Sequence, residues 1–388
     1  MIIGIDGSRL SGQRTGTELY SQYVIAALIV QARAQGHIVR VYVREPTIFA
    51  VAPEEVVSIQ RSRLWTHIGL ASEIVQRPPD VLFIPSHILP LSCAWRRRPR
   101  TVVTVHDVGY RHFPHAHPLR QRLYLELGTA FTVRFADAVI VDSEATRRDV
   151  AHFYGSESDK TTVAPLGLVP VPEVTIGDTH AMRVRFNLPE GVPYVLHIGT
   201  RQPRKNLGRL LEAFAMGMQH EAWSVERGTI HAPRSAPHAS RPILVLAGGA
   251  GWGSEDLLAV AQGLGIAEHV RLTGYVSDIE KAALIRHAAV YACPSLYEGF
   301  GLPVLEAQSV GVPVICSNTS SLPEVAGESA LFFDSQNVSA IAEALTQALH
   351  NPVRREQMML AGAKNIARFS WDACAAIILA RIERTKRE

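Results

Sequence analysis

Several cationic side chains stand close together near the middle of the chain. Arg201, Arg204 and Lys205 follow the β-branched run at 194–199 and precede a helical pattern that begins at Leu207. Fixed positive charges at the end of a strand are suited to an anion such as a phosphate. A solvent-exposed basic loop is the alternative interpretation of this segment taken alone.

A second segment with chemical potential is the run at 295–307, which follows another apolar run. Gly299 and Gly301 permit close backbone approach, and Pro303 is typical of a first helical turn, so this helix would offer free N–H groups to a phosphate. Glu298 and Glu306 stand on either side of the helix start. Two carboxylates beside a phosphate would repel it unless they accept hydrogen bonds from sugar hydroxyls. The segment therefore predicts an anion site with hydroxyl recognition.

In the first half, His106 and Asp107 end a β-branched run, and the first run of the chain leads into a loop that contains Gly16. A histidine and an aspartate at a strand exit can orient or polarise a hydroxyl, and an N-capping pair is the alternative. The histidines at 112, 115 and 117 have the spacing of metal ligands but lack a carboxylate partner, and no D-x-D occurs to hold a divalent ion on a diphosphate. We therefore expect no metal site.

The elements that must position these residues form two repeats of one rhythm. Short β-branched runs alternate with longer helical patterns, which predicts parallel sheets of doubly wound α/β domains. The runs lie at 2–5, 38–43, 81–84, 101–107 and 138–143, and then at 194–199, 243–249, 270–275, 289–294 and 312–317. The rhythm restarts after a Pro-rich passage, so we expect one domain over 1–175 and a second over 176–371, with a cleft between them. The segment at 219–242 has no periodic pattern and is expected to be an exposed insertion.

The end of the chain has its own pattern. Ser370, Trp371 and Asp372 indicate a capped helix start, and an apolar face follows over 375–382. A face of this size must pack on a neighbour.

Composition limits the classes of protein that this chain can be. It has 388 residues, of which 47% are hydrophobic and 19% are charged, which is typical of a globular protein with two domains. No apolar run reaches the length of a membrane span, and the first residues do not have the pattern of a secretion signal. The four cysteines stand far apart without a C-x-x-C pair, which fits a reducing cytoplasm.

The net charge of +3 is unevenly distributed, because the excess of basic residues lies in the first half. Its densest run consists of Arg96, Arg97, Arg98 and Arg100. This run is too short for a nucleic-acid stripe, so no nucleic-acid partner is expected. It suits an anionic membrane surface or a phosphate-bearing acceptor, and a solvated loop is the alternative. We expect a cytoplasmic protein whose basic first domain makes peripheral contact with the inner face of the membrane.

Taken together, these residues resemble the family 4 retaining glycosyltransferases of GT-B fold. The most specific match is the segment from Glu298 to Glu306, which has that family's paired glutamates separated by seven residues. The stretch at 199–206 resembles the family's basic donor loop, His106 and Asp107 its acceptor-domain histidine segment, and 142–144 its helix-opening serine segment. The implied fold has two Rossmann-like domains that face each other across a deep cleft. The resemblance also implies that the helix over 372–388 packs back on the first domain.

The resemblance also implies a role for each matched residue. Lys205, helped by Arg201 or Arg204, would bind the donor diphosphate, Glu306 the nucleotide ribose and Glu298 the transferred sugar. His106 would lie between donor and acceptor, and we take His106, Glu298 and Lys205 as the catalytic set. The remaining donor contacts would come from Gly16 near the diphosphate, Tyr275 and Val276 beside the base, and Gly299, Phe300, Gly301 and Leu302 at the phosphates or the sugar. Thr200 stands where such families commonly place an arginine after the loop glycine, which leaves both arginines as candidates.

The implied reaction moves a hexosyl group from a nucleotide diphosphate sugar to a hydroxyl of a glycan or lipid-linked acceptor, with retention and without a metal or another cofactor. GDP-mannose is the preferred donor, and a UDP-hexose or a UDP-N-acetylhexosamine is the alternative. A sugar-nucleotide 2-epimerase shares the fold but needs no acceptor. A hinged ligand-binding protein would need no carboxylate pair beside an anion site.

Overall fold

A computed structural model describes residues 1–10, 16–45, 48–60, 63–94, 99–114, 118–219, 241–253 and 255–387. They form two compact units. Unit 1 contains the described residues of Met1–His112, Leu119–Leu168 and Phe369–Glu388. Unit 2 contains those of Val169–Arg368, together with Phe113, Pro114 and Pro118. The chain thus leaves unit 1 after Leu168, a few residues before the predicted boundary at 175, and returns to it at Phe369.

Unit 1 is built on a parallel seven-stranded sheet in the order β3-β2-β1-β4-β5-β6-β7. The order runs in opposite directions from the centre, so the sheet is doubly wound and its switch point lies between β1 and β4. The strands are β1 (Ile2–Asp6), β2 (Ile38–Val43), β3 (Glu55–Ser58), β4 (Val81–Ile84), β5 (Arg100–Val105), β6 (Ala138–Val141) and β7 (Thr161–Val163). The helices are α1 (Gly16–Ala34), α2 (Ala71–Gln76), α3 (Gly109–His112), α4 (Leu119–Phe135), α5 (Glu144–Tyr154) and α14 (Trp371–Arg387).

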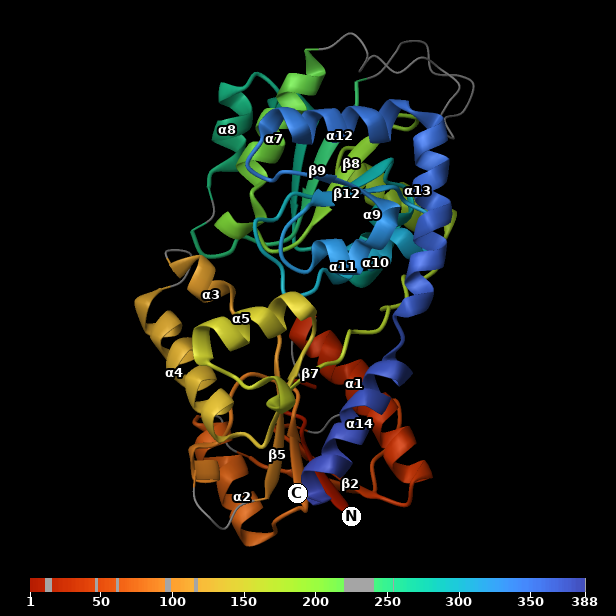
Figure 1. The fold of residues 1–388 in the computed structure, drawn as a ribbon. Coiled ribbons are helices and arrows are strands. Elements are labelled where there is room, and N and C mark those ends of the chain that lie inside the picture. The colour runs from red at the N-terminus through yellow and green to blue at the C-terminus, as the bar shows by residue number, and fades with distance from the viewer. Residues whose placement is uncertain are drawn as a thin grey trace. The chain divides into compact units, whose positions relative to one another are not determined.

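The last helix, α14, packs on unit 1 against α1 and against β4, β5 and β6 (Figure 1). It begins at Trp371, and the Ser370 hydroxyl accepts a hydrogen bond from the Asp372 N–H at 3.2 Å. The Trp371 ring stacks on Tyr23, with centroids 5.4 Å apart, and its indole N–H donates to the carbonyl of Leu168. The apolar face of α14, formed by Cys374, Ala375, Ile378, Leu379 and Ile382, is buried.

Unit 2 repeats this plan with a parallel six-stranded sheet in the order β10-β9-β8-β11-β12-β13. Its switch point lies between β8 and β11. The strands are β8 (Tyr194–Ile198), β9 (Ile243–Ala247), β10 (Val270–Gly274), β11 (Val290–Cys293), β12 (Val314–Ser317) and β13 (Ala330–Phe333). The helices are α6 (Ile176–Arg185), α7 (Leu207–Met218), α8 (Leu257–Gly263), α9 (Asp278–Arg286), α10 (Leu302–Ser309), α11 (Leu322–Ala326), α12 (Val338–His350) and α13 (Pro352–Asn365).

Side-chain alternation along the strands divides the core of unit 2 into two layers. On β8, Val195 packs with residues of α7, α8 and α12, whereas Tyr194 and Leu196 pack on the opposite face with residues of α6, α9 and α10. Successive residues of a strand point to opposite faces, and a parallel sheet covered on both sides is buried on both. The apolar runs in the sequence therefore lack a polar face because no face of the sheet meets water.

The predicted α/β class and its two repeated halves are confirmed. The sequence patterns missed β3, β7 and β13, each of which lies at the edge of a sheet. Of the predicted insertion at 219–242, residues 220–240 lie outside the described residues, as do Arg96, Arg97 and Arg98.

Candidate functional site

The basic loop of unit 2 leaves β8 at the switch point and enters a short 3-10 turn, η5 (Pro203–Lys205). Asn206 ends the turn in a left-handed conformation, with φ of 58°, and begins α7. Its buried amide donates to the carbonyls of Pro294 at 3.1 Å and Ser335 at 2.7 Å. These bonds tie the loop to the segments after β11 and β13, so the positions of Arg204 and Lys205 are fixed relative to those segments.

Arg204 and Lys205 converge on the carboxylate of Glu298. Lys205 Nζ donates to Glu298 Oε1 at 2.5 Å, and Arg204 Nη1 donates to Glu298 Oε2 at 2.9 Å. The Ser295 hydroxyl adds a third bond to Oε1 at 2.6 Å. The structure thus joins two segments, 201–206 and 295–307, that the sequence placed only at separate strand exits.

Glu298 is buried, and burial alone would raise its pKa, but the charges of Lys205 and Arg204 lower the pKa well below its usual value. At neutral pH the side chain is therefore a carboxylate, which accepts hydrogen bonds and cannot donate a proton. It can bind sugar hydroxyls but cannot act as a general acid.

Two serines hold the backbone around Glu298. The Glu298 N–H donates to the Ser320 hydroxyl at 2.9 Å, and the Ser321 hydroxyl lies 2.9 Å from the carbonyls of both Glu298 and Phe300. Gly301 then precedes α10 with φ of 110°, a conformation that favours glycine. Pro303 stands in the first turn of α10, after Leu302, so the predicted helix start is confirmed. Gly299 and Phe300 are buried in this turn.

Glu306 lies in α10 with a buried side chain. Lys281 of α9 donates to its Oε1 at 2.5 Å, whereas Oε2 has no hydrogen-bond partner among the described residues. A buried carboxylate oxygen without a partner costs free energy, and a ligand hydroxyl would supply the missing donor. This geometry suits the hydroxyl recognition expected from the sequence.

Tyr275 and Val276 follow β10 at the same edge of the sheet. The Tyr275 side chain is 65% exposed, and Val276 is half-buried and packs on the core of unit 2. An exposed aromatic ring at a strand exit offers a stacking surface without further rearrangement.

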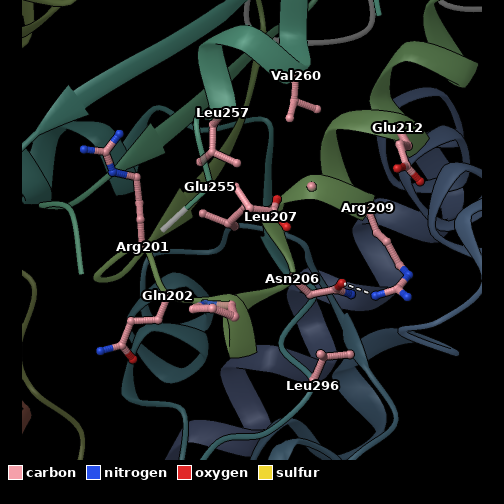
Figure 2. Close-up of a pocket in the computed structure, with 12 residues that line it drawn as sticks. Arg201, Gln202, Asn206, Leu207, Arg209, Glu212, Glu255, Leu257, Val260 and Leu296 are labelled. Atoms are coloured by element: carbon pink, nitrogen blue, oxygen red, sulfur yellow. Dashed lines mark hydrogen bonds between the residues drawn. The ribbon is translucent and has the colours of Figure 1, made fainter. Parts of the chain in front are cut away.

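Arg201 does not share the partner of Lys205. It lines a pocket of 470 Å³ that Lys205, Glu298 and Glu306 do not line, together with Asn206, Arg209 and other residues drawn in Figure 2. In that pocket the Arg209 guanidinium donates to Asn206 Oδ1 at 2.9 Å. Of the two arginines proposed to assist Lys205, the geometry therefore favours Arg204.

In unit 1, His106 follows β5 directly and has acceptors at both ring nitrogens. Its Nδ1 lies 2.8 Å from Asp142 Oδ2, and its Nε2 lies 3.2 Å from the Pro85 carbonyl oxygen. Burial would lower the pKa of His106, but the charge of Asp142 raises it overall. Two acceptors and a raised pKa favour the imidazolium, which is a hydrogen-bond donor and not a base. Tyr20 of α1 packs edge-on against the ring, with centroids 4.6 Å apart.

The sequence predictions for unit 1 also concern Gly16, Ser143 and the histidines at 112, 115 and 117. Gly16 is exposed at the start of α1, and among the described residues no atom outside its chain neighbours and the nearby backbone of α1 lies within 4 Å of a methyl group added there. Ser143 caps α5, as its segment predicts, with its hydroxyl accepting from the Thr146 N–H. His112 Nε2 lies 3.1 Å from Asp149 Oδ2, and the histidines at 115 and 117 are outside the described residues. Within the described ranges, no group of three or more His, Cys, Asp or Glu is arranged to hold a metal ion.

Sequence reasoning missed Lys281, the pairing of Asp142 with His106, and the serines at 320 and 321. A lysine in the second turn of an amphipathic helix has the pattern of a solvent-facing charge, so no local signal distinguishes Lys281. The serines belong to the β12–α11 loop and meet Glu298 only through the tertiary fold.

Comparison with known protein families matches both halves of the chain. Residues 178–365 match the family described as "Glycosyl transferases group 1", and residues 21–170 match "Glycosyltransferase Family 4". The first match contains the whole site around Glu298, and the second contains His106 and Asp142.

Individual relatives agree with these families. The chain is 31% identical over 294 residues to "O-antigen chain mannosyltransferase B" of Escherichia coli, an alignment that covers 75% of this chain and 70% of that protein. It is 28% identical to a "D-inositol 3-phosphate glycosyltransferase" of Segniliparus rotundus, over 66% of this chain but only 54% of that protein. Its fold is similar to that of sucrose-phosphate synthase from Thermosynechococcus elongatus, with a TM-score of 0.73, 20% identity, and 99% and 98% of the two chains covered.

Proposed function

The chain belongs to the family 4 glycosyltransferases of GT-B fold, and from this premise we propose that it transfers a mannosyl group from GDP-mannose to a hydroxyl of a glycan or lipid-linked acceptor. We include retention of configuration at the anomeric carbon and independence from metal ions in the proposal. One observation carries it: Arg204 and Lys205 converge on Glu298 at the switch point of unit 2. The similarity to an O-antigen chain mannosyltransferase supports the choice of sugar.

The arrangement of charges suits a leaving diphosphate. Arg204, Lys205 and Lys281 supply three positive charges against the two carboxylates of Glu298 and Glu306. A diphosphate that takes up Lys205 and Arg204 would release Glu298 to accept hydrogen bonds from the sugar. Glu306 Oε2 is available for a ribose hydroxyl. Preorganised cations at a developing negative charge stabilise the transition state by several kcal/mol, as an order of magnitude.

The reaction then needs no strong base from the protein. The bond between the anomeric carbon and the diphosphate oxygen breaks, and a bond to the acceptor oxygen forms on the same face of the sugar. The departing phosphate oxygen takes the proton of the acceptor hydroxyl. Glu298 is ionised and His106 favours its imidazolium. In this proposal the two residues therefore position and stabilise groups of the substrates.

A panel of nucleotide sugars tests the donor. GDP-mannose should raise the melting temperature more than UDP-glucose, UDP-N-acetylglucosamine, ADP-glucose or TDP-glucose, because a ligand at 100 times its Kd stabilises by about 2.7 kcal/mol. A larger shift with a UDP-sugar would replace the proposed donor. NMR of the product with a saccharide acceptor should show a retained anomeric configuration. Epimerised sugar formed without any acceptor would instead indicate a 2-epimerase.

We also propose peripheral contact between unit 1 and an anionic membrane, through the outward face of α4. Four large apolar side chains form a stripe on this helix and are exposed by 53% to 75%, with Arg120 and Arg122 beside them: Leu119, Leu123, Tyr124 and Leu127. Exposed apolar side chains next to arginines suit a helix that lies in the membrane interface. None of the described helices is long and apolar enough to cross a bilayer.

Vesicle sedimentation tests this contact. The protein should sediment with phosphatidylcholine vesicles that contain phosphatidylglycerol, and less with phosphatidylcholine alone. Leu123→Asp with Leu127→Asp should abolish binding. Vesicle binding that this double variant retains would contradict the use of α4.

A further inference from the structure

His197, near the end of β8, has a ring nitrogen that the site described so far does not use. The side chain is buried, with 1% exposure, and its Nδ1 lies 2.9 Å from the Ala292 carbonyl oxygen. A carbonyl only accepts hydrogen bonds, so Nδ1 carries the proton and Nε2 is an unprotonated acceptor. Nε2 is buried and has no hydrogen-bond partner within the described part of the chain.

An apolar side chain at this position would avoid the free-energy cost of a buried acceptor that has no partner. Val195, two residues earlier on β8, lies in the apolar layer with α7, α8 and α12. A buried acceptor without a partner is unfavourable, because it has lost its hydrogen bond to water and gained none in the protein. The unsatisfied acceptor at His197 Nε2 therefore calls for an explanation, such as a hydrogen-bond donor that reaches it when the site is occupied.

A charged group, Lys205, lies close to this nitrogen. A carbon added at the Cα of Gly199 would lie 3.4 Å from His197 Nε2 and 3.5 Å from Lys205 Nζ, so the two nitrogens border the same small space. Lys205 Nζ now donates to Glu298 Oε1. A small rotation of the lysine chain would carry its ammonium to His197.

The two acceptors around Lys205 differ in charge. Glu298 is a carboxylate and neutralises the ammonium, whereas an unprotonated imidazole accepts a hydrogen bond and leaves the positive charge available. Burial and the charge of Lys205 lower the pKa of His197 to about 4, so the ring stays neutral near pH 7.

We propose that His197 Nε2 accepts a hydrogen bond from the Lys205 ammonium when a nucleoside diphosphate occupies the site and Glu298 turns to the sugar. His197 is then a positioning residue, which holds Lys205 toward the diphosphate without reducing its charge. The inference rests on the proposed function, because it requires a diphosphate at Lys205. A ligand hydroxyl or a water that donates to Nε2 instead is an outcome that the test below distinguishes.

Two substitutions separate the two nitrogens of the ring. His197→Asn keeps an N–H for the Ala292 carbonyl but lacks the distal acceptor, whereas His197→Gln places an amide oxygen near Nε2. GDP and UDP are the probes, and their Kd values are measured by calorimetry with melting temperatures as a control for folding. His197→Asn should weaken binding of the preferred diphosphate about tenfold, as expected for one bond to a charged group, and His197→Gln should recover much of the loss.

A double-mutant cycle with Lys205→Gln tests whether His197 acts through the lysine. The effect of His197→Asn should vanish when Lys205 is already replaced. An equal loss in both backgrounds, or unchanged affinity in His197→Asn, overturns the inference and leaves the proposed function standing. A wild-type protein that binds neither GDP nor UDP overturns the proposed function and this inference with it.

A measurement on the wild-type protein remains valid even where His197→Asn fails to fold. The ¹⁵N resonance of His197 Nε2 should shift toward that of a hydrogen-bonded nitrogen when the diphosphate binds. No shift on saturation overturns the inference. The same shift in Lys205→Gln would identify a ligand group or a water as the donor and would also overturn it.

Discussion

The buried carboxylates at the carboxyl ends of the two sheets have different kinds of partner. In unit 2, Glu298 and Glu306 are bonded to Arg204, Lys205 and Lys281. In unit 1, Asp142 is bonded to His106. Lysine and arginine keep their charge across the neutral range, whereas histidine is the side chain whose charge changes there.

Because of this difference, the carboxyl edges of the two sheets suit different ligands. A diphosphate requires positive charge at every working pH, which Arg204, Lys205 and Lys281 supply at the unit 2 edge. The unit 1 edge has in His106 a cation that can be lost, with the ring of Tyr20 packed edge-on against it. Such groups suit a ligand with hydroxyls better than one with phosphates.

The largest effect is expected from Lys205→Gln. The glutamine can still donate a hydrogen bond to Glu298 but carries no charge, and loss of one preorganised charge contact reduces the transfer rate about 10² to 10³-fold. Steady-state turnover is the measurement, and Lys364→Gln on the exposed surface of α13 is the matched control. Turnover near that of the wild type would remove Lys205 from the catalytic set.

Acid should destabilise the protein through His197. Its folded pKa of about 4 lies below the unfolded value of 6.5, so as pH falls through this window the unfolded state binds a proton that the folded state does not. Between pH 7 and 4.5 the wild type should lose about 2.5 kcal/mol more unfolding free energy than His197→Asn, which does not titrate. Denaturant unfolding at both pH values measures the difference. Parallel losses would contradict a neutral buried ring.

A smaller effect is expected from Glu306→Gln. Replacing a charged acceptor with a neutral one should weaken nucleoside diphosphate binding about tenfold, because the hydroxyl bond to Oε2 loses its charge. Calorimetry with GDP and UDP measures the change, and Glu343→Gln on the exposed side of α12 is the control. Unchanged affinity would leave the ribose contact without support.

The pH response of unit 1 should be small and opposite in sign. The pKa of His106 is raised, so its stabilisation is complete below pH 6.5 and is lost as pH rises through the raised value. Histidine NMR should show His106 titrating above 6.5, and Asp142→Asn should move the midpoint down. Diphosphate affinity in unit 2 should stay flat over the same range. A His106 midpoint below 6.5 would remove the contrast.

No effect at all is expected from EDTA, because in the proposed reaction Arg204, Lys205 and Lys281 meet the charge of the diphosphate. Turnover in EDTA is compared with turnover in added magnesium or manganese. Loss of activity that either metal restores would refute metal independence. The histidines at 112, 115 and 117 would then be the candidate metal ligands.

The fold was predictable where the sequence is locally consistent. Central strands such as β8 and β11 are continuous apolar runs because both faces are covered. The missed strands β3, β7 and β13 are short and lie at sheet edges. Glu55–Ser58 alternates half-buried and exposed residues, and Thr161–Val163 has only three residues, so neither forms an apolar run.

The candidate site was predictable in part. Arg204, Lys205, Glu298 and Glu306 follow from strand exits and from the family motif. Lys281, His197 and the partner of His106 do not, because the role of each depends on a contact with a group far away in the sequence. His197 stands in an apolar run that predicts a core strand, and only the fold places its Nε2 beside Lys205.

The return of the chain to unit 1 has a consequence for the order of folding during synthesis. Unit 1 needs α14, but the ribosome makes the 200 residues of Val169–Arg368 between Leu168 and Phe369. At about 5 to 20 residues per second, this interval lasts about 10 to 40 s. During that time the apolar side of α1 that packs against α14 in the complete chain has no helix packed on it. Nascent unit 1 therefore exposes an apolar surface until synthesis ends, and unit 2 can complete its core first.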